Sequence, residues 1–308
     1  PAREEVQFDL SRLRALENRP EAYGSALTES LFVHPRQRLF FEQALSLVRR
    51  KQQRLRIRLQ IDPGASELHA LQWETLRGLE EDGFLTLTEG VYFMRFLTSP
   101  TWARIELRPM GDFRALLVFA NPAGLTEDRL STVEQARSSL GETPVTVLSA
   151  QFGNRPASLQ NLVKSLSEAY DILYLDCHVA FVQDKPLLWF ENDEGGVDVV
   201  AGSALVARLS ELRWRPRLVV LANGQTEALA VLAPRLAEAG IMAVLAIQGN
   251  VGGTLPLFMT TFFKELWLDG QVDRAVAVAR TSVGNRSGWW APVLYQRGRD
   301  GKLWDAQK

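Results

Sequence analysis

The sequence predicts an α/β fold in which a mostly parallel sheet is covered by helices on both faces. From about residue 112 onward, short apolar segments alternate with longer segments whose apolar residues recur at helical spacing. The short segments are apolar almost throughout, which is typical of strands that are buried on both faces. Strands that alternate with helices in this way pack as three layers joined by right-handed crossovers.

The individual elements of this region follow from the same alternation. Five apolar segments are predicted strands of the sheet: 114–120, 144–150, 171–177, 217–222 and 242–248. Amphipathic segments predict helices at 125–140, 158–169, 202–213, 226–239, 254–269 and 271–283. The segment 187–191 is predicted to form a hairpin strand beside 171–177. The segment 289–295 contains Pro292, which has no backbone N–H, so we expect this strand at the edge of the sheet.

The N-terminal part of the chain has a weaker pattern. Residues 1–30 are polar and mixed, and we expect a loosely ordered lead-in there. The following pattern predicts helices at 37–50 and 67–77, and strands at 55–61, 84–88 and 91–97, of which the last two form a hairpin. We therefore expect a single domain over 31–308, with an N-terminal subregion at 31–111 and a core at 112–308.

The charge distribution argues against two classes of partner. The formal net charge is −1, so the chain as a whole has no electrostatic attraction to nucleic acid or to an anionic membrane. The densest basic run, 49–58, ends in alternation with apolar residues, which favours a strand with one solvated face over a nucleic-acid patch. No apolar run reaches the ~18 residues that a membrane-spanning helix needs. We expect neither nucleic acid nor a membrane as a partner.

The cysteine content limits the chemistry further. Cys177 is the single cysteine, which excludes a disulfide framework and a cysteine-based structural zinc site. We expect a cytoplasmic protein that uses no metal and no cofactor.

Polar residues at the ends of three predicted strands form the candidate site, because ligands of open α/β sheets bind beyond the carboxyl ends of the strands. His178 follows the strand 171–177, where an imidazole could act as a general base or could be an ordinary loop residue. Cys177 points to the opposite side in an extended chain and is therefore a poor partner for it. Asp176 shares the side of His178, where it could orient or charge-pair the imidazole, line a pocket that takes a basic side chain, or be an exposed strand-end carboxylate. His34 and His69 have no such setting, and we expect structural or surface roles for them.

The other two strand ends carry the remaining candidates. The segment Ala222–Thr226 has the strand–bend–helix form of a nucleophile turn, but its bend holds Gly224, which has no side chain. Gln225 follows, and Thr226 is expected to be the helix N-cap rather than a nucleophile. Gln248 and Asn250 lie in IQGNVGG, at 247–253, which matches neither the dinucleotide fingerprint nor the P-loop spacing. A nucleotide-binding role for that segment is the weaker alternative.

Five segments of the chain resemble CHAT domains, which are caspase-like cysteine proteases related to caspases and separases. In chain order they are LRIRLQIDPGASELHALQWETLRG, YDILYLDCHV, LVVLANGQT, AVLAIQGNV and WWAPVLYQRGRDGKLW, so the resemblance covers about residues 30–304. It implies a caspase-like three-layer sandwich. It also implies a thiolate nucleophile, a histidine base and backbone amides that hold the oxyanion.

Three positions depart from the family's pattern of catalytic residues. His178 matches the catalytic histidine, but Tyr174 stands where the family usually has an earlier histidine and Val179 where it has a glycine. Gly224 stands where the family has its cysteine.

The resemblance leaves two hypotheses from different classes. The first is a catalytically inactive pseudoprotease that binds a peptide or protein through Asp176, Val179, Gln225, Gln248 and Asn250. CHAT domains often accompany TPR or sensor modules, and bacterial members occur in defence systems, so such a module is an expected partner on the same or another chain. The second is a cysteine endopeptidase whose nucleophile at position 224 was replaced by design.

Overall fold

A computed structural model gives the fold and describes residues 5–79, 83–97, 107–122, 130–249, 251, 253–298 and 301–305. The chain divides into two compact units. The smaller contains Pro1–Ile57 and Leu71–Phe93, and the larger contains Arg58–Ala70 and Met94–Lys308. The predicted domain limits, 1–30 and 31–308, remain a prediction.

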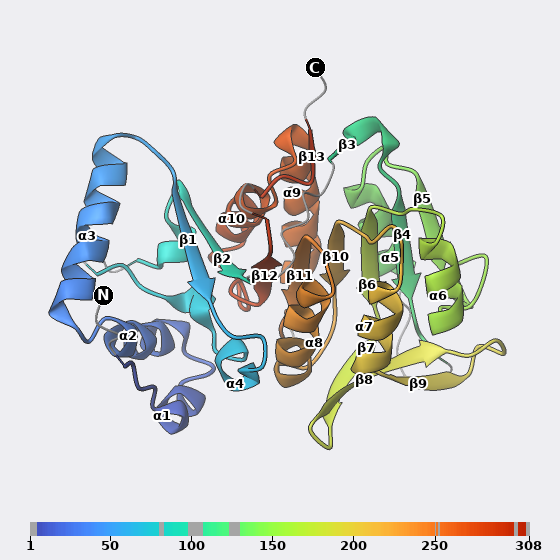
Figure 1. Cartoon of the computed structure of the whole chain (residues 1–308), viewed down its shortest axis with the longest axis horizontal. Coiled ribbons are helices and arrows are strands. Elements are labelled where there is room, and N and C mark those ends of the chain that lie inside the picture. The colour runs from blue at the N-terminus through green and yellow to red at the C-terminus, as the bar shows by residue number, and fades with distance from the viewer. Residues whose placement is uncertain are drawn as a thin grey trace. The chain divides into compact units, whose positions relative to one another are not determined.

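The smaller unit is built around helices that bury part of their apolar residues, although Leu39 and Phe40 of α3 are exposed. It contains α1 (Leu10–Ala15), α2 (Pro20–Leu31) and α3 (Pro35–Arg50) (Figure 1), and a 3₁₀ turn at Trp73–Thr75. A side chain at Gly24 would collide with the backbone carbonyl of Thr75, so this glycine allows α2 to pack closely on that turn. The expectation of little order over residues 1–30 is wrong for α1 and α2, because Leu13 and Leu27 anchor these helices in the unit's core.

The main sheet carries the predicted alternation. In the described part of the chain its order is β1-β2-β12-β11-β10-β6-β4-β5 (Figure 1). Its strands are β1 (Leu55–Gln60), β2 (Val91–Phe96), β4 (Ala115–Phe119), β5 (Val145–Leu148), β6 (Ile172–Asp176), β10 (Leu218–Leu221), β11 (Ala243–Ile247) and β12 (Pro292–Gln296). The pairs β2–β12, β11–β10, β10–β6, β6–β4 and β4–β5 are parallel, and β12 runs antiparallel to β11. A short parallel pair joins β3 (Arg108–Pro109) to β13 (Trp304–Asp305).

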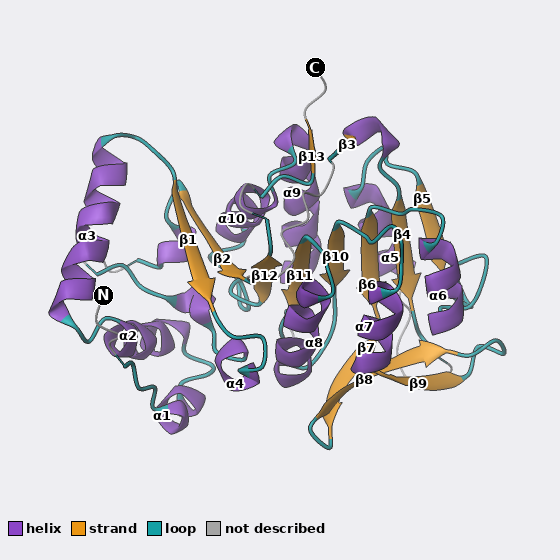
Figure 2. Cartoon of the chain, in the orientation of Figure 1, coloured by secondary structure: helices purple, strands orange, loops and turns teal. Residues whose placement is uncertain are grey.

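Rows of apolar side chains across the sheet explain why its strands are buried. The register aligns Leu116, Leu173, Val219 and Val244 across β4, β6, β10 and β11, and all four are fully buried. Their core includes residues of α6 (Leu159–Leu166), α7 (Gly202–Ser210) and α8 (Thr226–Glu238). The other helices of this layer arrangement pack on one another and on the opposite side of the sheet: α5 (Leu130–Ser139), α9 (Thr254–Asp269) and α10 (Val272–Ser282) (Figure 2). The predicted α/β sandwich with a mostly parallel sheet is confirmed.

Three local expectations are wrong. The segment 84–88 forms a 3₁₀ turn, Leu85–Leu87, instead of a hairpin strand. The helix expected at 67–77 is shortened to α4 (Ser66–His69), followed by the turn at Trp73–Thr75. The strand β12 lies between β11 and β2, not at the edge, because Pro292 is its first residue and its missing N–H leaves the rest of the ladder intact.

A second, antiparallel sheet follows β6 directly. It consists of β7 (His178–Val182), β8 (Lys185–Glu191) and β9 (Val197–Ala201). The expected hairpin strand at 187–191 is therefore part of β8, which pairs with β7 and β9 rather than with β6. One face of this sheet, including Val179, Leu188 and Phe190, joins the core with α6, α7 and α8.

Candidate functional site

His178 begins β7, directly beyond the carboxyl end of β6. Its side chain is exposed. The register pairs it with Trp189 of β8, and the two rings meet edge to face with their centroids 4.8 Å apart. Within the described part of the chain, the imidazole makes no hydrogen bond or ion pair. It is therefore available to solvent and to a ligand, as the sequence predicts, but from a strand rather than a loop.

Cys177 and Asp176 differ from His178 in exposure. Cys177 is fully buried in the apolar core, as its alternation with His178 predicts. Asp176 is also buried, at 6% exposure, and its backbone carbonyl accepts a hydrogen bond from Ala120 N–H (3.0 Å). The interpretation of Asp176 as an exposed strand-end carboxylate is wrong, because the parallel pairing of β6 with β4 continues to this residue.

Gln225 links the segment after His178 to the bend after β10. Its backbone N–H donates to the Val179 carbonyl (2.9 Å), and the Phe181 N–H donates to Gln225 Oε1 (2.8 Å). These two hydrogen bonds fix β7 beside the start of α8. The structure thus brings together His178, Val179 and Gln225 from two strand ends. The helix N-cap is Gln225 rather than Thr226, which is the first residue of α8.

Gly224 lies in this bend and has no room for a side chain. A Cβ at this position would lie 2.9, 3.0 and 3.1 Å from the three branch carbons of Leu229. Leu229 is fully buried in the same core as Cys177 and Val179. Contacts this short require the neighbour to move, and close-packed cores resist such movement. Leu229 thus occupies the space that a side chain would need at the position that the resemblance aligns with the family's cysteine.

Gln248 belongs to a different polar cluster. Its Nε2 donates to the hydroxyl of Tyr295 (3.2 Å) and, more weakly, to the His69 carbonyl (3.4 Å). The guanidinium of Arg95 donates to the same two oxygen atoms. Asn250, the other predicted pocket residue of this strand end, lies outside the described residues.

His69 has a structural role in that cluster, as expected. It is fully buried, and its Nε2 lies 3.2 Å from the Asp62 carbonyl oxygen. Burial, together with the positive charge of Arg95, lowers its pKa from 6.5 to about 4. The imidazole is therefore neutral near pH 7 and takes no part in the site around His178.

Glu191 is a residue near the site that the sequence pattern does not identify. It ends β8 fully buried. Its carboxylate accepts backbone hydrogen bonds from Asn121 (3.1 Å), Ala150 (2.7 Å) and Ala157 (2.6 Å). One side chain thereby ties together the segments that follow β4 and β5. An acidic residue at the end of an apolar strand gives no sequence signal for such a role.

Metal-ligand groups and membrane-spanning helices are both absent from the described residues. No group of three or more His, Cys, Asp or Glu side chains there is arranged to hold a metal ion. None of the described helices is long and apolar enough to cross a membrane.

Comparison with known proteins supplies the family. A family model, CHAT domain, matches residues 21–295, which is most of the chain. No curated protein matches the sequence significantly. The mixed α/β architecture with its mostly parallel sheet is consistent with a caspase-like sandwich. The chain therefore belongs to the CHAT domain family.

Proposed function

We propose that this chain is a catalytically inactive CHAT-type pseudoprotease that binds a peptide or protein segment beside His178. The observation that carries the proposal is the packing of Leu229 against Gly224. A cysteine there would begin with a Cβ within 3.1 Å of three leucine carbons, and its sulfur would need still more space. Without a thiolate, His178 has no nucleophile to activate.

Cys177 does not replace that nucleophile. It is fully buried among apolar side chains, where a thiolate would be costly to form. Its chain neighbour His178 is exposed, so the two side chains occupy different environments.

The exposed face of the β7-β8-β9 sheet supplies the binding surface. Residues opposite one another in antiparallel strands share a face, and the register aligns His178, Trp189 and Val199 in one row. Val199 is 47% exposed and Val197, on the same strand and face, is 44% exposed. Exposed apolar residues that adjoin one another are typical of interaction sites. An extended peptide with apolar side chains fits this surface, with His178 at its end.

The resemblance to CHAT domains guides the choice of partner. We propose a protein or peptide partner, supplied by a TPR or sensor module on the same or another chain, in a bacterial defence or signalling system. Asp176 and Gln248 are too buried to contact it directly, so Val179, through its backbone, and Gln225 remain the nearest predicted pocket residues.

A peptide-display selection tests the binding role. The intact chain should enrich a common apolar sequence from a random library and leave the enriched peptides uncleaved. The double variant Trp189→Ala, Val199→Ser should weaken binding of these peptides at least tenfold. Val278→Ser, at another exposed valine on α10, serves as the matched control and should bind like the unaltered chain. No enrichment, or enrichment that the double variant leaves unchanged, contradicts the proposed surface.

The alternative hypothesis, a protease whose cysteine was replaced by design, makes a different prediction. It requires that cysteine at position 224 alone restores cleavage, since the rest of the machinery would be intact. His178, exposed and without a hydrogen bond within the described chain, is the one observation that favours it.

A further inference from the structure

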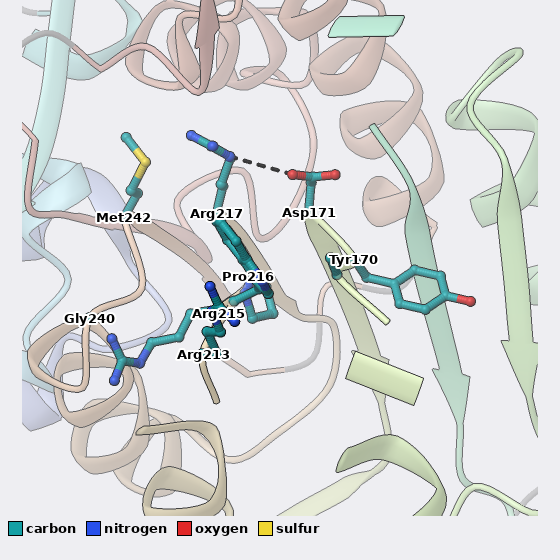
Figure 3. A pocket seen from close by; sticks show the side chains of 10 residues that line it. Tyr170, Asp171, Arg213, Arg215, Pro216, Arg217, Gly240 and Met242 are labelled. Atoms are coloured by element: carbon teal, nitrogen blue, oxygen red, sulfur yellow. Dashed lines mark ion pairs between the residues drawn. The ribbon is translucent and has the colours of Figure 1, made fainter. Parts of the chain in front are cut away.

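A pocket lies at the amino ends of the main-sheet strands, opposite to the carboxyl ends that carry His178. Its cavity measures about 270 Å³ and lies at the amino ends of β6, β10 and β11 (Figure 3). Asp171, Arg217 and Met242 each precede one of these strands and line it. Each of these strands is four or five residues long, so their amino ends lie about 15 Å from the carboxyl ends that carry the candidate site. The pocket is therefore a separate feature.

Three arginines on one short segment line the cavity: Arg213, Arg215 and Arg217. Asp171 is the acidic residue of the described lining, and it pairs with Arg217 at 3.4 Å, where both side chains are under 10% exposed (Figure 3). In this buried pair the negative charge of Asp171 neutralises the positive charge of Arg217. In the described chain no carboxylate pairs with Arg213 or Arg215, so the mouth of the cavity carries excess positive charge.

A fourth arginine, Arg297, lies close to Arg215. Arg215 Nη1 and Arg297 Nη1 lie 3.2 and 3.4 Å from the same point, where a Cβ would stand at Gly240. Gly240 has a φ of +110°, which a residue with a side chain adopts only with strain, so glycine allows both guanidinium groups to approach its backbone. Burial lowers the pKa of Arg297, and the charge of Arg215 lowers it further. The positive charge of Arg297 therefore lies near Arg215, although Arg297 is not one of the residues that line the cavity.

We propose that this pocket binds the oxyanion group, phosphate or carboxylate, of a small molecule, with Arg213 and Arg215 as the principal contacts. The planar guanidinium presents paired N–H donors that match the oxygen atoms of both groups. Arg213 lies at the mouth, where its guanidinium is 5.6 Å from the ring centre of the exposed Trp214. The cavity is larger than one phosphate group, so it also accepts part of the molecule that carries the anion.

Calorimetric titration of the intact chain with inorganic phosphate and, separately, with citrate tests this site. We expect saturable binding of at least one of them, and the stronger one identifies the anion class. Arg215→Gln should weaken it at least tenfold. Arg235→Gln, which removes an exposed arginine of α8 that pairs with Glu238, is the charge-matched control and should bind as the unaltered chain does.

Arg213→Gln gives a second readout in case Arg215→Gln fails to fold, because Arg213 is exposed. We expect it to weaken binding several-fold. The proposal is overturned if neither anion binds, if binding survives both substitutions at the pocket, or if Arg235→Gln weakens binding equally, which would indicate a general charge effect.

Discussion

The space that a side chain would need at position 224 is occupied by Leu229, five residues further along the chain. The backbone of Gly224 is not in the left-handed region, so conformation alone would allow any residue there. The restriction comes from packing, since Leu229 is fully buried and held by the core. A nucleophile at this position therefore conflicts with the core, and adding one requires a change at a second residue.

The substitution Gly224→Ala tests this conflict at its smallest scale. The new methyl group should overpack the core and lower the free energy of unfolding by ~1–3 kcal/mol. Gly83→Ala is the matched control, because a Cβ at Gly83 meets no described atom within 4 Å. Urea denaturation compares the two. Equal stability of Gly224→Ala and the unaltered chain would mean that Leu229 moves aside freely.

His69 gives the fold a dependence on pH. Its pKa is about 4 in the folded chain and 6.5 when unfolded, so between these values the unfolded state binds more protons. Stability from this residue is complete above pH 6.5 and is lost as the pH falls towards 4, by on the order of 3 kcal/mol. His69→Gln should flatten this part of the stability profile. A profile of His69→Gln that still falls as steeply between pH 6.5 and 4 as that of the unaltered chain would refute the assignment.

At the scale of elements, β7, β8 and β9 form a platform that the strand ends of the main sheet hold in place. Gln225 attaches β7 to α8 through two hydrogen bonds. Glu191 attaches the end of β8 to the segments after β4 and β5. The outer face of the platform can remain exposed and apolar because its inner face and both attachments keep it ordered.

Replacement of the Glu191 carboxylate tests the second attachment. Glu191→Gln keeps the shape but leaves one acceptor oxygen for three backbone N–H groups, so we expect a loss of about 3 kcal/mol of stability. Hydrogen exchange should accelerate at the amides of Ala150 and Ala157. Glu194→Gln, at an exposed acid in the next turn, should alter neither quantity. Unchanged exchange at both amides would show that Glu191 does not hold these segments.

The elements that could be predicted from the sequence are those whose pattern of apolar residues fits only one kind of secondary structure. β4, β6, β10 and β11 are short apolar runs between helices, and only a buried strand fits them. The run at 84–88 alternates in a way that fits a strand, but Thr86 donates its hydroxyl proton to the Glu74 carbonyl and stabilises a 3₁₀ turn instead. Pro292 predicts an edge strand because proline has no backbone N–H to donate to a neighbouring strand. This loss does not matter at the first residue of a strand, which is the place of Pro292 in β12.

The site was predictable in its exposed parts and not in its packed ones. The alternation around Cys177 separates it correctly from His178, because successive side chains of an extended chain point to opposite sides. No pattern in the sequence shows that Leu229 fills the space beside Gly224, since that contact depends on the angle at which α8 leaves the bend. The side chain of Gln248 likewise turns to Tyr295 because of a partner that is 47 residues away in the chain.

At the scale of the whole molecule, the larger unit uses the two ends of one parallel sheet differently. The carboxyl ends lead to His178, Gly224 and the apolar platform. The amino ends hold an arginine-lined cavity of about 270 Å³. A partner segment and a small anion can therefore bind the same unit without competing for residues. Our central proposal is that the carboxyl ends bind a partner segment and do not cleave it.

Cleavage of the selected peptides by four forms of the chain tests that claim most directly. The forms are the unaltered chain, Gly224→Cys, the double variant Gly224→Cys, Leu229→Ala, and the double variant Gly224→Cys, His178→Ala as the background control. We predict that the unaltered chain and Gly224→Cys cleave no faster than the background control. Leu229→Ala removes the three branch carbons that a Cβ at position 224 would contact, so the double variant with Gly224→Cys shows whether this packing alone prevents cleavage. Robust cleavage by Gly224→Cys alone that disappears when His178 is also replaced by alanine would contradict the account and establish a protease that lacks only its nucleophile.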